Sequence, residues 1–177
     1  MKKKILLIFT AMLAATGVGA NTGCSNSYEA PIWSEVIQDV RNKYPDVKQL
    51  QTDELYSWLT NLKKESIFLI DARTKEEFQG SHISGAENIS YKCKNLLKYL
   101  TNIRPDTPIV VYCSVGYRSS NLAGKLQTLD FKEVYNLEGS IFKWANEGRP
   151  LVQGQKKVYC VHPYNTHWGS LLEKKYH

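Results

Sequence analysis

Two unbroken apolar runs constrain the fold of this chain more than any other feature of its sequence. One lies at residues 67–70 within "SIFLIDAR", and the other lies at residues 109–113 within "PIVVYC". Short continuous runs of this kind are typical of strands that are buried on both faces of a parallel sheet. We therefore predict a sheet with helices packed against both of its sides.

The segments around these runs alternate between helical and extended patterns. The predicted helices span 33–44, 52–65, 74–80, 93–102, 119–129 and 139–148, and the predicted strands span 47–51, 66–73, 85–90, 108–113 and 131–138. In the first helix, Ser34 is available as a cap and Pro45 follows the end. Strands that alternate with helices through short connections indicate an α/β domain with a largely parallel sheet.

The N-terminus has the pattern of an export signal. Lysines at positions 2–4 precede a short apolar run and then small residues up to Ala20, as in a secretory signal peptide. The run is too short for a comfortable membrane span. The Gly-Cys pair at 23–24 is an alternative signal for lipidation of Cys24, although Asn21 stands where lipoprotein signals usually have an aliphatic residue. We expect an exported protein, periplasmic or secreted, that meets a membrane only if Cys24 is lipidated.

These boundaries divide the chain into four parts. We expect a signal peptide at 1–20, an N-terminal extension with one helix at 21–46, the main domain at 47–151 and a C-terminal extension at 152–177. Removal of the three leader lysines lowers the formal net charge from +6 to +3. The remaining basic residues are scattered among acids, so we expect no nucleic-acid partner.

Cys113 is the candidate reactive group. It stands at the carboxyl end of a predicted strand, where ligands bind in open parallel sheets, and a helix follows. The amides of residues 114–119 can turn toward its sulfur, and Gly116 permits the tight backbone that this requires. Amides, a helix end and the charge of Arg118 all favour a thiolate. We therefore predict a reactive thiol at Cys113, in preference to a small buried side chain.

Several ordered motifs resemble a single-domain rhodanese, a member of the thiosulfate sulfurtransferase family. They are "LIDARTKEEFQGSHISGAENIS", "PIVVYCSVGYRSS" and "VYNLEGSIFKWANEGRPL", and the resemblance covers about residues 50–151. It implies a rhodanese-like five-stranded parallel sheet flanked by helices on both faces. It also implies that Cys113 accepts a sulfur atom from thiosulfate or from a persulfide donor and then holds this atom as a cysteine persulfide. The acceptor would then be cyanide or a thiol, including a protein thiol, and no cofactor is implied.

The resemblance assigns roles to further residues. The loop residues would hold the transferred sulfur; they are Ser114, Val115, Gly116, Tyr117 and Arg118. Arg73 would contact the sulfonate of the donor, and Asp71 would orient the loop or Arg118. His82 matches a family histidine of architectural role. Glu77 lies three residues after Thr74, so we interpret it as part of a helix capping box.

The length of the cysteine loop bears on the chemistry. Cys113 and Arg118 bound a six-residue loop, whereas related phosphatases and arsenate reductases use a loop that is one residue longer. The shorter loop fits one sulfur atom better than a tetrahedral oxyanion. Many thiosulfate-using members carry basic residues immediately after the cysteine, whereas this loop has Ser114, Val115 and Tyr117, so an organic persulfide or a protein thiol is an alternative to thiosulfate. Two other functions stay open: a sulfur-carrier or binding module without turnover, and a thiol-redox protein.

The remaining cysteines and the C-terminal extension give weaker signals. If Cys24 is lipidated or lies in a loose tail, Cys93 and Cys160 form the natural disulfide pair and leave Cys113 free. The extension also holds histidines at 162, 167 and 177, but their spacing from Cys160 is not that of a structural zinc site, so we expect no metal. We expect residues 157–162 to pack as an edge segment. Tyr164 and Trp168 would cover apolar surface or form a partner site.

Overall fold

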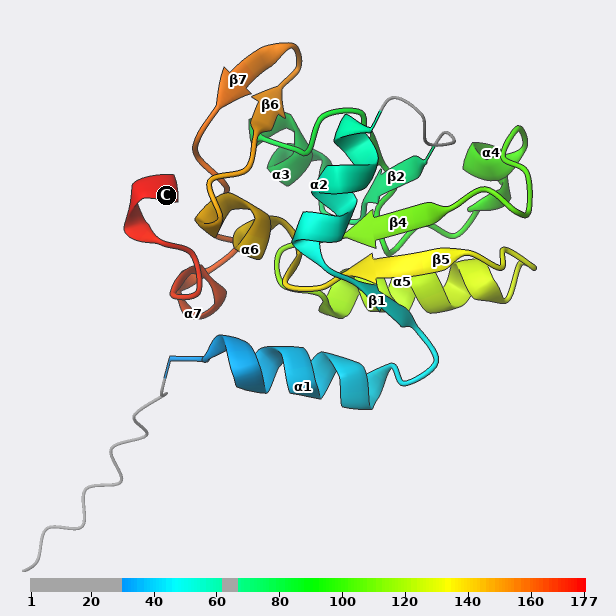
Figure 1. The fold of residues 1–177 in the computed structure, drawn as a ribbon, viewed down its shortest axis with the longest axis horizontal. Coiled ribbons are helices and arrows are strands. Elements are labelled where there is room, and N and C mark those ends of the chain that lie inside the picture. Colours follow the sequence, from blue (N-terminus) through cyan, green and yellow to red (C-terminus); the bar gives the residue numbers. More distant parts are fainter. Residues whose placement is uncertain (1–29, 62–66) are drawn as a thin grey trace, which may run out of the picture.

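The computed structural model describes residues 30–61 and 67–177. The predicted signal peptide and Cys24 lie outside the described residues. Figure 1 shows a central sheet with helices on its two sides, a helix near the N-terminal end of the described chain, and a C-terminal extension at one side of the sheet. Within the described residues, no helix combines the length and the apolar character needed to cross a membrane.

The centre of the molecule is a five-stranded parallel sheet with the strand order β1-β5-β4-β2-β3. Its strands are β1 (Lys48–Leu50), β2 (Phe68–Asp71), β3 (Glu87–Asn88), β4 (Ile109–Tyr112) and β5 (Val134–Leu137). β4 is the middle strand, and all four of its residues are buried. Asp71 at the end of β2 pairs in register with Tyr112 at the end of β4, so the carboxyl ends of both strands meet at one edge of the sheet.

Helices cover both faces of this sheet, as the two apolar runs predict. Alternate residues of β4 belong to two separate apolar clusters, because successive side chains of a strand point to opposite faces. The cluster on one face includes side chains from α2 (Thr52–Thr60) and α6 (Ser140–Asn146). The cluster on the other face includes side chains from α4 (Leu97–Leu100) and α5 (Tyr117–Gln127). The short helix α3 (Lys75–Gly80) follows β2.

The N-terminal extension contains the predicted helix as α1 (Trp33–Lys43), which buries Val36 and Val40 against the domain. The helix begins at Trp33 with Ile32 as its N-cap residue, and no side chain caps it. The prediction of Ser34 as the cap was therefore wrong, because Ser34 already lies inside the first turn. Tyr44 ends the helix directly before Pro45, as predicted.

The C-terminal extension packs along the α2–α6 side of the sheet. It contains the antiparallel hairpin β6 (Leu151–Gln153) and β7 (Lys156–Val158), the helix α7 (Thr166–Gly169) and the 3-10 turn η1 (Lys174–Tyr176). The hairpin does not extend the main sheet, and it contacts the domain through a bridge between His82 and Val152. Val161, Leu171 and Leu172 are buried in the same cluster as α6, so this segment contributes to the core.

The Cys93–Cys160 disulfide that the cysteine count suggested is not formed. Both thiols are free, as is that of Cys113. Cys93 packs against the α4–α5 cluster, whereas Cys160 is exposed beside Val161, which belongs to the cluster on the opposite face. The two thiols therefore belong to different layers of the molecule.

Asp71 and Arg73 form a fully buried ion pair at the end of β2. The Nη2 and Nε atoms of Arg73 donate to Asp71 at 2.7 and 3.0 Å, Nη2 also donates to the carbonyl of Ser81, and both side chains are 0% exposed. Burial opposes the charge on Arg73, but Asp71 keeps the pKa of this guanidinium above its ordinary value. Arg73 thus faces the protein interior, and the prediction that it binds the donor's sulfonate was wrong.

We expect Arg73→Met to lower the free energy of unfolding by about 3–5 kcal/mol, because it leaves the Asp71 carboxylate buried without a partner. Urea unfolding followed by circular dichroism measures this loss. The matched control is Arg104→Met at the exposed Arg104–Asp106 pair, which should change stability by less than about 0.5 kcal/mol. Equal losses in the two variants would show that burial of the first pair is unimportant.

Candidate active site

Cys113 follows β4 at the carboxyl edge of the sheet and begins a tight loop that leads into α5. Gly116 is the N-cap residue of α5 and has a φ of 124°, in the left-handed region that favours glycine. α5 begins at Tyr117, two residues before the predicted start at Ser119. The first turn of this helix therefore lies directly beside the sulfur, and Cys113 itself is 1% exposed.

Three groups face the sulfur of Cys113 at hydrogen-bond range. The amide of Gly116 donates to Sγ at 3.2 Å, and the hydroxyl oxygens of Ser119 and Ser140 lie 3.3 and 3.9 Å from it. The Ser119 hydroxyl also has Asn136 and the carbonyl of Gly116 within reach, and its single proton can rotate among these acceptors. These donors come from α5 and α6, so both helices build the site.

Ser140 connects the cysteine to α6. Its hydroxyl accepts a hydrogen bond from the amide of Cys113 at 3.1 Å, and its backbone has a φ of 53°. A non-glycine residue in the left-handed region is uncommon and costs energy, and such residues cluster at functional sites. The backbone at Ser140 thus holds a conformation that places its hydroxyl beside Cys113.

The surroundings of Cys113 favour its ionised form. Burial raises the pKa of the thiol, but the charge of Arg118, the hydroxyl of Ser119 and the amides of Gly116 and Ser119 act in the opposite direction. The balance holds the pKa of Cys113 below its ordinary value. A thiolate is the nucleophilic form of cysteine, so this site can carry out nucleophilic attack.

Arg118 is held by Glu77 of α3. Its two terminal nitrogens donate to the Glu77 carboxylate at 2.8 and 2.9 Å, and one of them also donates to the Ser114 hydroxyl at 2.8 Å. Asp71, which we expected to orient this arginine, is bound to Arg73 instead. Glu77 therefore orients Arg118, so the prediction that Asp71 orients this arginine was wrong, whereas the alternative that Asp71 orients the loop stays a prediction.

Glu77 has a second, structural function that the sequence did predict. Its carboxylate accepts from the amide of Thr74, and the Thr74 hydroxyl accepts from the amide of Glu77, so the capping box of α3 is present. Burial raises the pKa of Glu77, but Arg118 and the Thr74 amide outweigh it and lower this pKa to about 2. Glu77 is consequently ionised at neutral pH and fixes the loop to α3.

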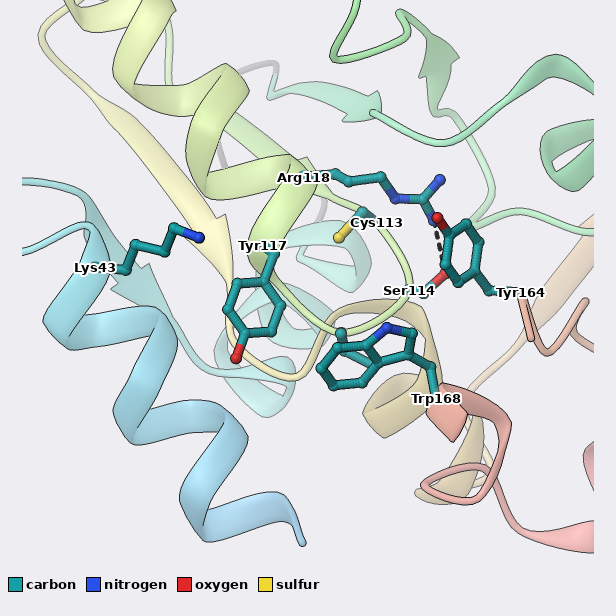
Figure 2. Close-up of a pocket in the computed structure, with 8 residues that line it drawn as sticks. Lys43, Cys113, Ser114, Tyr117, Arg118, Tyr164 and Trp168 are labelled. Carbon is teal, nitrogen blue, oxygen red and sulfur yellow. Dashed lines mark hydrogen bonds between the residues drawn. The ribbon is translucent and has the colours of Figure 1, made fainter. Parts of the chain in front are cut away.

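A pocket of about 330 Å³ opens beside Cys113. Figure 2 shows side chains that line it. Its lining residues are Lys43, Cys113, Ser114, Val115, Tyr117, Arg118, Tyr164 and Trp168. The ring of Tyr164 lies 4.6 Å from the Arg118 guanidinium, and the rings of Tyr117 and Trp168 are 5.5 Å apart. Tyr164 and Trp168 therefore cover part of the cysteine loop, in addition to apolar surface.

The structure brings the predicted loop together but not the predicted donor contacts. Five of the six loop residues line the pocket, and the sixth, Gly116, is the N-cap residue of α5. Asp71 and Arg73 are buried at the end of β2 and do not line the pocket. His82 has the expected architectural contacts, since its ring stacks on Phe78 and bonds to the Phe78 carbonyl. Residues 30–61 and 67–177 contain no group of three side chains suited to a metal ion.

Sequence reasoning missed several residues of the site. They are Lys43, Glu77 as a partner of Arg118, Ser119, Asn136 and Ser140. The sequence did contain a signal for Ser119. A serine in the first turn of the helix that follows a cysteine loop can direct its hydroxyl toward the cysteine sulfur. The other four come from distant segments, and their proximity depends on the tertiary fold.

Comparison with known proteins decides the family. The family model of the rhodanese-like domain matches residues 52–147, which is more than half of the chain. The chain belongs to this family. The matched region begins with α2 and ends with α6, so it contains Cys113 and Glu77. It does not contain the pocket residues that come from α1 and from the C-terminal extension.

Curated relatives of this rhodanese-like protein share about a third of its residues over the domain. The uncharacterized protein YqhL of Bacillus subtilis is 39% identical over 79 residues, which are 45% of this chain and 61% of that protein. The thiosulfate sulfurtransferase GlpE of Coxiella burnetii is 31% identical over 101 residues, 57% of this chain and 87% of GlpE. The chain spans only 24% of the probable adenylyltransferase/sulfurtransferase MoeZ of Mycobacterium tuberculosis, at 32% identity.

Solved structures agree with the rhodanese-like fold. The BH2092 protein of Bacillus halodurans matches with a TM-score of 0.59 and 20% identity, over 78% of this chain and 98% of that one. A thiosulfate sulfurtransferase from Pseudomonas aeruginosa matches with a TM-score of 0.57 and 21% identity, over 68% of this chain and 22% of that one. At these identities the likeness establishes the fold alone.

The low pKa of Cys113 predicts rapid alkylation at neutral pH. We expect the rate of Cys113 modification by iodoacetamide to have a pH midpoint below that of an ordinary thiol, and Arg118→Gln to raise this midpoint. Peptide mass spectrometry resolves Cys113 from the other cysteines. Arg104→Gln, at an exposed site, is the charge-matched control, and an unchanged midpoint in Arg118→Gln would contradict the assignment.

The Glu77–Arg118 pair predicts a pH-dependent stability. Because the pKa of Glu77 falls from 4.5 to about 2 on folding, its ionised form stabilises the fold above pH 4.5, and this contribution is lost as the pH falls toward 2. We expect Glu77→Gln to lower the free energy of unfolding at pH 7 by about 2–3 kcal/mol. Urea titrations between pH 7 and 2 should show this difference shrinking below pH 4.5.

Two substitutions on α5 serve as controls for that measurement. Arg118→Gln removes the same ion pair and should abolish the same pH-dependent part. Lys125→Gln removes a positive charge from the same helix but leaves Glu77 paired, so it should retain the wild-type pH profile. A constant difference between wild type and Glu77→Gln at every pH would point to capping alone.

Proposed function

We propose that this chain is a sulfurtransferase in which Cys113 carries the transferred sulfur as a persulfide. The donor is thiosulfate or an organic persulfide, and the acceptor is a thiol or cyanide. The observation that carries this proposal is the surroundings of the Cys113 sulfur. The Gly116 amide lies 3.2 Å from Sγ, and the Ser119 hydroxyl lies 3.3 Å from it. Membership in the rhodanese-like family and the similarity to the thiosulfate sulfurtransferase GlpE support it.

In the first half-reaction, the Cys113 thiolate attacks the outer sulfur of the donor. With thiosulfate, a new S–S bond forms at Cys113, the S–S bond of thiosulfate breaks, and sulfite leaves with the bonding electron pair. The negative terminal sulfur that remains on Cys113 needs hydrogen-bond donors in a water-poor site. The Gly116 amide and the hydroxyls of Ser119 and Ser140 are the groups available for this task.

In the second half-reaction, an acceptor nucleophile attacks the terminal sulfur of the persulfide. With cyanide, a C–S bond forms, the S–S bond to Cys113 breaks, and the products are thiocyanate and the free Cys113 thiolate. With a thiol, the acceptor becomes a persulfide in the same way. Burial of the Cys113 sulfur leaves only the pocket side for attack, so both half-reactions use one entrance.

Arg118 and Glu77 act in this scheme by holding the loop. Arg118 binds both Glu77 and Ser114, which fixes the loop on the side that faces α3. The guanidinium also places a permanent positive charge near the thiolate, and this charge is one of the causes of the low pKa of Cys113. Arg118 thus stabilises the attacking form of the cysteine and the charged sulfur that it later carries.

We expect purified protein to gain one sulfur atom on Cys113 when it is mixed with thiosulfate or an organic persulfide, and to release thiocyanate when cyanide follows. Intact-protein mass spectrometry and a colorimetric thiocyanate assay measure the two products. Cys113→Ser should lower kcat/KM by at least about a thousandfold, because the nucleophile is lost. Cys160→Ser removes an exposed thiol outside the pocket and should keep wild-type activity.

The same measurements separate the alternatives. A persulfide on Cys113 without thiocyanate formation would favour a carrier that delivers sulfur only to a dedicated partner. A Cys113 disulfide in protein purified without reductant would favour thiol-redox exchange. Absence of a persulfide with every donor would overturn the sulfurtransferase proposal.

A further inference from the structure

The pocket beside Cys113 is walled by residues from outside the matched domain. Lys43 lies at the end of α1, and Tyr164 and Trp168 lie in the C-terminal extension, whereas the family match spans 52–147. Figure 2 shows the three side chains around the entrance to the sulfur, with Lys43 on one side and the two aromatic residues on the other. The two extensions therefore give this chain a binding site that its cysteine loop alone does not provide.

The pocket is larger than one transferred sulfur requires. Its volume is about 330 Å³. Thiosulfate has only five heavy atoms, so it leaves most of this space unfilled. The volume lies near the lower end of the range of small-molecule sites, which suits a donor with an organic body of a few carbon atoms.

Two of the residues that line the pocket, Tyr117 and Trp168, form an aromatic surface. The Tyr117 hydroxyl donates to Asp39 of α1 at 2.6 Å, which holds the ring 5.5 Å from that of Trp168. Burial, together with Asp39, raises the pKa of Tyr117, so its ring stays neutral at ordinary pH. Rings held in this way offer apolar contact area with little loss of conformational entropy on binding.

The two cationic side chains that line the pocket, Arg118 and Lys43, differ in how free they are to bind a ligand. The Arg118 guanidinium is already bound to Glu77 and lies under the ring of Tyr164. Within residues 30–61 and 67–177, the Lys43 ammonium has no carboxylate partner, and its contact is the Tyr117 ring at 5.7 Å from the centroid. In Figure 2 this amine points toward the pocket, so Lys43 is the cation available to an anionic ligand.

We propose that the donor is a small organic persulfide that carries a carboxylate, and that Lys43, Trp168 and Tyr164 determine this specificity. The terminal sulfur lies at Cys113, the organic body lies against Tyr117 and Trp168, and the carboxylate pairs with Lys43. This inference rests on the proposed sulfurtransferase function and names the substrate class of the same site.

The transfer balances without another reactant. The Cys113 thiolate attacks the terminal sulfur of R–S–S–H, a new S–S bond forms at Cys113, and the S–S bond of the donor breaks. The thiolate R–S⁻ leaves with that electron pair, and Cys113 holds the S–S–H group with its proton. No change in the total oxidation state occurs, so neither an oxidant nor a reductant is needed.

Three donors test the proposal with the full chain: the persulfide of 3-mercaptopropionate, the neutral persulfide of 2-mercaptoethanol, and thiosulfate. We expect Lys43→Gln to lower kcat/KM for the carboxylated persulfide by about threefold and to leave the neutral persulfide unchanged, because an exposed ion pair is weak. Trp168→Ala should lower kcat/KM for both organic persulfides by about tenfold and change thiosulfate by less than about twofold.

Matched variants control for folding and for charge. Lys156→Gln on β7 and Tyr159→Ala, which is 67% exposed in the same extension, lie outside the pocket and should keep all three wild-type rates. Because Trp168 packs against the core, Trp168→Ala can also weaken the fold. Tyr164→Ala is therefore a second aromatic variant, at a side chain that is 47% exposed. Thermal unfolding of each variant checks that the fold is intact.

The outcomes distinguish the two proposals. Two results would overturn the specificity inference while Cys113 still accepts sulfur. One is that Lys43→Gln lowers kcat/KM equally for the neutral and the carboxylated persulfide. The other is that Trp168→Ala and Tyr164→Ala each lower kcat/KM for thiosulfate as much as for the organic persulfides. Absence of a Cys113 persulfide with all three donors would instead overturn the sulfurtransferase function, and the specificity inference with it.

Discussion

The ion pair between Arg118 and Glu77 is the interaction on which the rest of the site depends. It joins the first turn of α5 to the first turn of α3, and through Ser114 it also fixes the loop between them. A second tie between this loop of mostly neutral residues and α3 is the Ser114 hydroxyl, which donates to the same Glu77 carboxylate at 3.3 Å. With this pair in place, the Gly116 amide can remain directed at a buried sulfur, and the arginine charge stays close to it.

Two arginine–carboxylate pairs near the sheet edge have separate functions. The Asp71–Arg73 pair is fully buried and supports the segment after β2, whereas Arg118 of the second pair retains 13% exposure at the pocket. A buried pair is strongly destabilised by the loss of one partner, so it suits a structural task. The partly exposed arginine can both stabilise a thiolate and border a ligand site.

The sequence was sufficient for the sheet, for both helical layers and for the position of Cys113, because these depend on local periodicity and on the order of strand, loop and helix. Long-range pairing could not be predicted in the same way. The "Asp-x-Arg" motif is compatible either with a contact to the sulfur donor or with an internal ion pair. The full burial of Asp71 and Arg73 in the structure shows that they form an internal pair. Likewise, a capping box at Glu77 does not reveal that Arg118 will reach it across the fold.

The covering of the pocket by Tyr164 and Trp168 has a consequence for how the protein is made. Synthesis proceeds from the N-terminus, so the cysteine loop leaves the ribosome before the segment that partly covers it. Until Val161 and Leu171 enter the core, that thiol lies beside an incomplete wall. Newly made chains therefore pass through an interval in which oxidants have freer access to Cys113, and prompt docking of the C-terminal segment protects it.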